Sequence, residues 1–175
     1  DNDYRKAGEA MNRAMYKNHP YGTQTTIGTG EHLKNPSMEK IHQYFNAYYV
    51  PNNMAVIMAG DINYDSTIAM VDKYFGSWKA KPVPAFTFKP EAPIAKADTL
   101  SVYGPMAGWV TMGWRFAGTG TSDPMMLELI SGLMSNGQAG LIDLDLMQQQ
   151  KVLEAYAYSS EQADFSEFSM GGNPK

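Results

Sequence analysis

Three histidines and the carboxylates near them are the residues whose types could bind a catalytic metal. A catalytic zinc ion needs about three protein ligands and an open position for water. The chain contains His19, His32 and His42 and no cysteine. One established arrangement places two histidines and a glutamate on a single helix in the order His-x-x-Glu-His. A zinc site built from this chain would therefore need these histidines together with neighbouring carboxylates.

The sequence around His32 matches only the second half of that arrangement. Glu31 and His32 occupy its last two positions, but Gly28 stands in the place of the first histidine and cannot bind a metal. The glycines in this segment favour a loop over residues 28–34, and a loop does not hold two ligands on one helix face. We therefore expect no zinc site at His32.

His42 also lacks a suitable partner. Gln43 follows it, so the order His-Glu-x-x-His is absent. Glu39 lies three residues before His42 on the same helix face, but such pairs are common on solvated helix surfaces. The sequence thus predicts no metal ligand, no zinc and no other cofactor bound by this chain itself.

Other arrangements for catalysis or cofactor binding are missing as well. Gly28-Thr29-Gly30 lacks the Lys-Ser/Thr pair of a phosphate-binding loop. Asp143 and Asp145 would diverge by about 200° on a helix and could not share a proton. The serines have no Ser-His-Asp context, and a cysteine nucleophile is impossible. The segment His19-Pro20-Tyr21-Gly22 is predicted to be a turn that ends a helix.

Composition excludes several classes of function. The 175 residues are 43% hydrophobic, which is enough to form a packed core. The net charge of −4 and the isoelectric point near 5.3 argue against binding to nucleic acid. No apolar run approaches the roughly 20 residues needed to span a bilayer. We therefore expect neither a nucleic-acid partner nor a membrane span.

The first 78 residues are predicted to hold three helices and one strand. Asn35-Pro36 is a typical helix start, because Asn can cap free N–H groups and Pro fits the first turn. Gly76 is expected to end the last of these helices in a left-handed conformation. The predicted helices cover residues 3–17, 35–49 and 65–75, and the predicted strand covers residues 53–59.

A proline-rich stretch at residues 79–97 separates the two halves of the chain. Its four prolines forbid a helix and favour an extended connection. The elements predicted after it are strands at 99–103, 108–116, 155–159 and 165–170, and helices at 123–135 and 141–151. Strands and helices do not alternate strictly, so we predict the α+β class, with helices packed on one face of a mostly antiparallel sheet.

Several motifs appear in a fixed order along residues 19–78. They are HPYG at 19–22, Ile27-Gly28, the Asn35-Pro36 helix start, YYVPNNM at 48–54, Gly60-Asp61 and KYFGSW at 73–78. Through these motifs the chain resembles the insulinase/pitrilysin-type zinc peptidases, the inverzincins. An ordered series of motifs is more specific than any one of them. Since the His-x-x-Glu-His helix is missing, the resemblance implies a fragment of such a peptidase.

The resemblance also implies a division into domains. Residues 1–78 would be the C-terminal part of a first peptidase-like domain, residues 79–97 a linker, and residues 98–175 the N-terminal part of a second, non-catalytic domain. Both domains would have the metallohydrolase-type α+β fold. In the intact protein the helices that bind zinc would lie before Asp1, so no ligand can be transferred to a residue of this chain.

The family implies an activity for the intact protein. Its members are zinc endopeptidases that enclose peptides between two similar halves; zinc lowers the pKa of a bound water, and a glutamate takes its proton. This chain would form chamber wall and domain interface and would be inactive alone. An Arg and a Tyr in the partner half assist the reaction in that family. Tyr156 is the candidate for that Tyr, but Met147 and the glutamines at 148–150 occupy the Arg position, and Arg115 lies on a predicted strand.

The expected partners are a peptide or protein substrate and the other half of the peptidase. Cutting a two-domain half at both ends would expose apolar surface, so we also expect this chain to self-associate. A metal-free paralogue that serves as an assembly or peptide-binding subunit is the alternative, and the sequence upstream of Asp1 would distinguish it. A third hypothesis is a free-standing interaction module with exposed aromatic and methionine side chains. Family habit and the lack of cysteine favour the bacterial periplasm or cell envelope.

Overall fold

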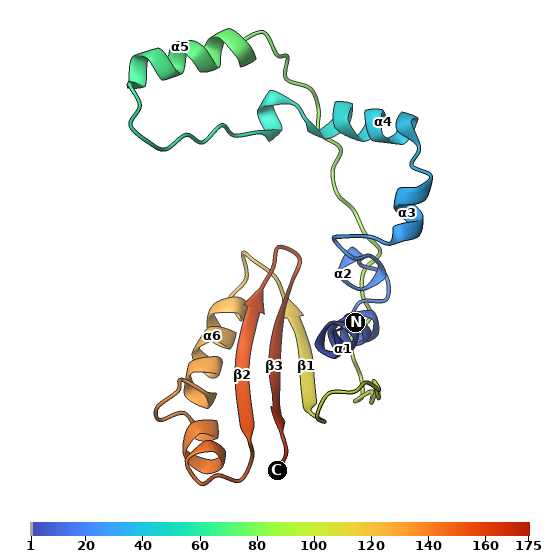
Figure 1. Cartoon of the computed structure of the whole chain (residues 1–175), viewed down its shortest axis with the longest axis vertical. Helices are drawn as coiled ribbons and strands as arrows, with labels where there is room; N and C mark the ends of the chain where they lie inside the picture. The colour runs from blue at the N-terminus through green and yellow to red at the C-terminus, as the bar shows by residue number, and fades with distance from the viewer. Residues whose placement is uncertain (1) are drawn as a thin grey trace. The chain divides into compact units, whose positions relative to one another are not determined.

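Figure 1 shows the computed structural model of the chain, which describes residues 2–175. The chain divides into two compact units. Unit 1 combines the residues up to Gln24 with Pro90–Lys175, and unit 2 is formed by Thr25–Lys89. Unit 2 is therefore an insertion in the sequence of unit 1. The predicted division at 1–78, 79–97 and 98–175 does not coincide with these units; it concerns complete peptidase-like domains and stays a prediction.

Unit 1 is built around a three-stranded antiparallel sheet. Its strands, in the spatial order β1-β3-β2, are β1 (Val110–Ala117), β2 (Glu154–Glu161) and β3 (Phe165–Asn173). The register places Phe168 of β3 between Trp114 of β1 and Ser159 of β2. The strands predicted at 108–116, 155–159 and 165–170 are thus confirmed, and β2 and β3 extend a few residues further.

The apolar core of unit 1 lies between the sheet and helix α6 (Asp123–Met134). Pro124 lies in the first turn of α6, where its fixed φ and its missing N–H are both tolerated. Figure 1 shows α6 running alongside β2. The buried side chains of this core are Leu127, Ile142, Ala157 and Phe168. Together the sheet and its helix confirm the α+β class.

Helix α1 (Asp3–Met15) packs against β1 on the other face of the sheet. The Asn2 side chain caps it by accepting from the N–H of Arg5 at 3.2 Å. At Gly113 of β1 a Cβ atom would lie 2.9 Å from the sulfur of Met11, so the helix packs closely only because this residue is glycine. Successive strand residues point to opposite faces, so Gly113 faces α1 whereas its neighbour Trp114 shares the face of Phe168 and α6.

Unit 2 consists of helices joined by irregular segments. Its elements are α3 (Gly30–Lys34), α4 (Met38–Tyr48), the 3₁₀ turn η1 (Pro51–Asn53) and α5 (Tyr64–Phe75). The helices predicted at 35–49 and 65–75 are confirmed, but the first begins later than expected. Ser37, not Asn35, caps α4 by accepting from the N–H of Lys40 at 3.3 Å.

Four local predictions are wrong. The segment predicted to be a loop at 28–34 contains α3, and the turn predicted after His19 is the short helix α2 (Pro20–Thr23). Gly76 is right-handed, with φ −61° and ψ −21°, because its N–H continues the helix by donating to Asp72. The helix predicted at 141–151 is shortened to one π-helical stretch, η2 (Asp143–Met147), after an initial turn.

The strands predicted at 53–59 and 99–103 do not form. Residues 54–59 are exposed and carry no regular structure. A strand is stable only when a neighbouring strand pairs with its N–H and C=O groups, and no described residue of unit 2 belongs to a strand. The proline-rich stretch at 79–97 contains no helix, as predicted. Within residues 2–175, none of the helices has both the length and the apolar character required to cross a membrane.

Candidate functional site

A buried cluster of polar and aromatic side chains occupies one end of the sheet in unit 1. We call it the polar cluster; it consists of Tyr16, His19, Glu91, Arg115, Asp164, Phe165 and Glu167. Tyr16 and His19 come from the end of α1 and the start of α2, Arg115 from β1, and the acidic residues from three separate segments. Tyr16 is fully buried and His19 is 1% exposed. Charged and polar groups this far from water need partners, and the geometry supplies them.

Glu91 and Arg115 tie the proline-rich segment to the end of α1. One carboxylate oxygen of Glu91 accepts from the backbone N–H of Asn18 at 2.6 Å and of His19 at 2.7 Å. The other lies 3.7 Å from Nη1 of Arg115. Burial alone would raise the pKa of Glu91, but the N–H groups of Asn18, His19 and Lys17, together with the charge of Arg115, lower it below the ordinary value.

The Arg115 guanidinium also binds backbone carbonyls. It donates to the carbonyl oxygens of Met15 and Ala92, which belong to α1 and to the proline-rich segment. Its planar group lies 5.7 Å from the ring centre of Tyr16 and 5.3 Å from that of Phe165. The planar guanidinium stacks on two rings and donates hydrogen bonds to two chain segments. It therefore holds the two segments together more rigidly than a lysine side chain could.

Tyr16 and Glu167 form the second part of the polar cluster. The phenol of Tyr16 donates to Oε1 of Glu167 at 2.7 Å. Burial, followed by the hydrogen bond and the negative charge of Glu167, raises the pKa of Tyr16 far above its ordinary value, although the charge of Arg115 opposes the change. The phenol therefore stays a neutral donor throughout the physiological range.

His19 is held by contacts on both ring nitrogens. Nδ1 accepts from the backbone N–H of Tyr21 at 3.2 Å, and Nε2 lies 3.3 Å from Oδ2 of Asp164. The rings of Tyr21 and Phe165 pack edge-on against the imidazole, with centres 4.1 and 5.3 Å away. With Nδ1 as an acceptor, Nε2 is the ring nitrogen that bears hydrogen, and it lies near Asp164 without the geometry of a hydrogen bond. Neither nitrogen has a lone pair directed at a cation, so this histidine does not fit zinc.

The two remaining histidines lie in unit 2 and are exposed. In α3, Glu31 next to His32 pairs with Lys34. In α4, the carboxylate of Glu39 accepts from Gln43 at 3.0 Å. Across residues 2–175 there is no group of three or more His, Cys, Asp or Glu side chains that could hold a metal ion. The side chains that the structure describes thus do not fit zinc, and no reaction step is assigned to them.

Tyr156 and Arg115 are not brought together. Tyr156 of β2 pairs with Gly171 of β3, whereas Arg115 of β1 pairs with Glu167. These two β3 positions are four residues apart, which corresponds to about 13 Å along a strand. The hydroxyl of Tyr156 lies over Gly171, only 2.5 Å from where a Cβ would be. A catalytic role for Tyr156 stays a prediction.

Sequence reasoning missed most of the polar cluster. Glu91 lies inside the stretch regarded as a linker, and Asp164 and Glu167 were not singled out. Strand alternation could place Arg115 only on the face opposite to Trp114, and it gave no sign that this face is covered. The positions of the acceptors that Arg115 binds depend on the tertiary fold.

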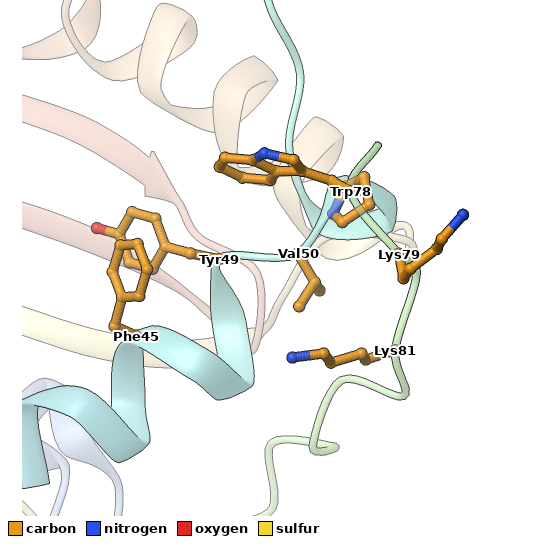
Figure 2. Close-up of a pocket in the computed structure, with 7 residues that line it drawn as sticks. Phe45, Tyr49, Val50, Trp78, Lys79 and Lys81 are labelled. Carbon is orange, nitrogen blue, oxygen red and sulfur yellow. The ribbon is translucent and has the colours of Figure 1, made fainter. Parts of the chain in front are cut away.

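Unit 2 contains a small apolar pocket, shown in Figure 2. Its volume is about 210 Å³, and it is lined by Phe45, Tyr49, Val50, Pro51, Trp78, Lys79 and Lys81. The rings of Phe45 and Tyr49 stack with their centres 4.5 Å apart, side by side in Figure 2. Asn52 pairs its side-chain amide with the backbone of Lys81, a lining residue, at 3.0 and 3.1 Å. No acid–base pair lines the pocket, so it offers packing rather than catalysis.

Comparison with known proteins assigns the chain to a family. The model described as "Peptidase M16 inactive domain" matches residues 37–175. The chain belongs to the peptidase M16 family. These are insulinase-type zinc peptidases, so the resemblance found in the sequence is confirmed, and the matched region is the one described as inactive.

Two curated relatives of this peptidase M16 chain are named zinc proteases. The zinc protease PqqE of Helicobacter pylori is 26% identical over 167 residues, which are 91% of this chain and 37% of the relative. The zinc protease YmxG of Bacillus subtilis is 36% identical over 83 residues, 47% of this chain and 20% of the relative. The chain therefore spans well under half the length of these relatives.

Solved structures of peptidases share the fold. A protease from Helicobacter pylori superposes with a TM-score of 0.70 at 21% identity, over 98% of this chain and 46% of the other. An M16-like peptidase from Alicyclobacillus acidocaldarius gives 0.71 at 18% identity, over 99% and 43%. The ferredoxin protease FusC, in complex with Arabidopsis ferredoxin, gives 0.63, and the periplasmic protease PqqL of Escherichia coli gives 0.59; each is under 20% identical, and the chain covers 20% of each.

Proposed function

We propose that this chain is a non-ligating part of a zinc metalloendopeptidase and forms part of the wall of its substrate chamber and of an interface between its domains. The observation that carries the proposal is the match of residues 37–175 to the inactive domain of the peptidase M16 family. Zinc and the residues that bind it would belong to other parts of the intact protein. The role of this chain is then to shape and support the site.

Exposed apolar side chains support the interface role. On unit 1, Trp114 of β1 is 42% exposed and Leu133 of α6 is 70% exposed. Further exposed apolar side chains are Val110, Met112 and Phe116 on β1 and Met126, Leu129 and Ile130 on α6. Large apolar side chains gathered on the surface of a domain are typical of a contact with another protein surface. The other half of the peptidase is the expected occupant.

The relatives indicate which ligands and which location to test. FusC was solved with a protein bound, and we propose that the intact protein likewise takes a peptide or protein substrate. PqqL is a periplasmic protease, and we propose the same compartment here. The wall position would let this chain contact substrate without supplying a metal ligand.

The decisive experiment measures zinc content and peptide cleavage in the intact protein, with and without a chelator. We expect stoichiometric zinc and chelator-sensitive cleavage, and neither in the 175-residue chain alone. His32→Ala in the intact protein is the matched control and should leave zinc content and cleavage unchanged. An intact protein that binds no zinc and cleaves nothing would instead establish the metal-free assembly or peptide-binding paralogue.

Self-association of the isolated chain tests the interface separately. Apolar surface that normally meets another half should drive association in its absence. Light scattering is expected to give a mass above that of one chain, decreasing on dilution. A monodisperse monomer at all concentrations would argue against the interface while leaving the zinc chemistry of the intact protein untouched.

A further inference from the structure

The loop between α6 and η2 contains an unusual chemical liability. Asn136-Gly137 is the one Asn-Gly pair in the sequence. Both residues are exposed, and Gly137 has a φ of +79°, a conformation that favours glycine. Because glycine has no side chain, its backbone nitrogen can approach the preceding asparagine side chain without steric hindrance. Such a pair is prone to lose ammonia.

The carboxylate of Asp143 binds the backbone of this loop. Its Oδ2 accepts from the N–H of Asn136 at 2.9 Å, of Gly137 at 2.9 Å and of Gly140 at 3.1 Å. Its Oδ1 accepts from the hydroxyl of Ser135 at 3.3 Å. The N–H of Asn136 is the largest cause that lowers the pKa of Asp143, followed by those of Gly140 and Gly137 and by Ser135, although burial opposes them. The Asp143 side chain is therefore ionised near neutral pH, and both of its carboxylate oxygens accept hydrogen bonds from this loop.

The Asn136 side chain is fixed as well. Its Oδ1 accepts from the N–H of Gln138 at 3.0 Å and of Ala139 at 2.9 Å. Its Nδ2 donates to the carbonyl of Gly132 at 3.0 Å. The amide that would react is thus held in one orientation by three hydrogen bonds, and the nitrogen that would attack it is bound by Asp143.

We propose that Asn136-Gly137 is a latent deamidation site and that Asp143 keeps it latent. The reaction requires the Gly137 nitrogen to lose its proton and turn towards Cγ of Asn136. A carboxylate that accepts that N–H stabilises the protonated nitrogen and directs it away from Cγ. Loop opening, or loss of the charge at position 143, removes both restraints.

The chemistry needs only water as a co-reactant. The Gly137 nitrogen attacks Cγ of Asn136, the new N–C bond forms a cyclic imide, and the side-chain nitrogen leaves as ammonia with the proton that the backbone nitrogen gave up. Water then adds to one of the two imide carbonyls and opens the ring. The product is aspartate or isoaspartate at position 136, and the net change is addition of water and release of ammonia.

The product would not fit the original loop. A carboxylate at position 136 could no longer donate to Gly132, and it would add a negative charge within a loop already organised around Asp143. Like charges at this range repel, so conversion would favour the open loop. The modification is therefore expected to be irreversible and to loosen the connection between α6 and η2.

The test follows deamidation in the 175-residue chain at mildly alkaline pH, by peptide mass mapping and enzymatic isoaspartate detection. The variant Asp143→Asn keeps the shape and removes the charge; we expect deamidation at Asn136 to become at least about tenfold faster, as for loss of a charge-assisted hydrogen bond. Asp145→Asn, two residues away on an exposed side chain, is the matched control and should match the wild type. Peptide mass mapping distinguishes deamidation at Asn136 from deamidation of the asparagine introduced at position 143. A folded D143N no faster than D145N would overturn the proposal.

Two further measurements cover a D143N variant that does not fold. Wild-type chain in its native state should deamidate at Asn136 at least about tenfold more slowly than the same chain in guanidinium chloride, because protection requires the closed loop. The variant Ser135→Ala loses one hydrogen bond to Asp143 and should be accelerated about threefold. Equal rates in native and denatured chain would show that the closed loop does not protect the site and would overturn the proposal.

Discussion

Units 1 and 2 both contain helices that carry large apolar side chains, but the burial of those side chains differs between the units. In unit 1, α6 packs on the sheet and buries Leu127. In unit 2, neither α4 nor α5 buries a single residue, although each has an apolar face that includes large side chains such as Phe45 and Ile68. The pattern specifies a helix in both units, but only a partner surface makes its apolar face contribute to stability. Unit 1 supplies that surface from its own residues.

A matched pair of phenylalanine substitutions gives the largest expected difference between the units. Phe168 is 8% exposed in the core of unit 1, and Phe45 is 49% exposed on α4. We expect Phe168→Ala to lower the free energy of unfolding by about 3–5 kcal/mol, because it removes buried contacts and leaves a cavity. Phe45→Ala should change it by less than about 1 kcal/mol. Urea unfolding followed by circular dichroism measures both.

The comparison fails if the two variants unfold at the same urea concentration. That result would mean that α4 is packed in solution as firmly as the sheet. A more polar control, Phe45→Ser, should also stay close to the wild type, since the side chain is 49% exposed and its ring contact is with Tyr49, which is also 49% exposed.

Glu91→Gln gives the next largest effect and tests how the proline-rich segment is attached. The variant removes the charge that receives the N–H groups of Asn18 and His19 and that pairs with Arg115. We expect the free energy of unfolding to decrease by about 1–3 kcal/mol, the range for hydrogen bonds to a charged group. Glu154→Gln, at the exposed start of β2, is the control and should be neutral.

The same residue predicts a dependence on pH. The folded-state pKa of Glu91 lies below its ordinary value of 4.5, so its contribution is complete above that value and is lost as pH falls through the folded pKa. The wild type should therefore lose more stability on acidification than E91Q does. Parallel pH profiles for the two proteins would contradict the role assigned to this carboxylate.

The sequence was sufficient to predict elements whose stability is local or paired within the chain. Local sequence features predicted three of these elements, and the structure confirms them. They are the helix start at Asp123-Pro124, the helix break at Asn136-Gly137 and the paired strands near 155–170. The apolar run at 53–59 has the composition of a strand, yet no described strand pairs with it. Composition can specify a preference for extended backbone, but the hydrogen bonds of a β-sheet form only when a second strand pairs with the first.

The polar cluster could be predicted only in part. Arg115 was correctly placed on a strand, and the alternation of side chains would have indicated its face. Its partner Glu91 lies 24 residues earlier along the chain, in a segment without periodicity, so no spacing rule connects them. The contact exists because the proline-rich segment passes the end of α1, which is a property of the fold.

Tyr16→Phe is expected to have a smaller effect, of about 1 kcal/mol, by removing the hydrogen bond to Glu167. Because the pKa of Tyr16 is raised by burial and by Glu167, the folded state favours the neutral phenol. Its contribution is complete below the ordinary value of 10.0 and is lost as pH rises above it. Alkaline unfolding should therefore be steeper for the wild type than for Y16F. Tyr158→Phe, on a half-exposed side chain, controls for general tyrosine ionisation.

His42→Ala is expected to have the smallest effect and sharpens the contrast with His19. His42 is exposed on α4, and its neighbour Glu39 pairs with Gln43 instead. We expect a change in unfolding free energy of less than about 0.5 kcal/mol and no change in the metal content of the chain. His19→Ala, in contrast, would empty a buried position between two aromatic rings and leave Asp164 without its partner. If H42A released a stoichiometric metal ion, unit 2 would hold a site that its described carboxylates do not form, and its exposed helices would have to be regarded as part of that site.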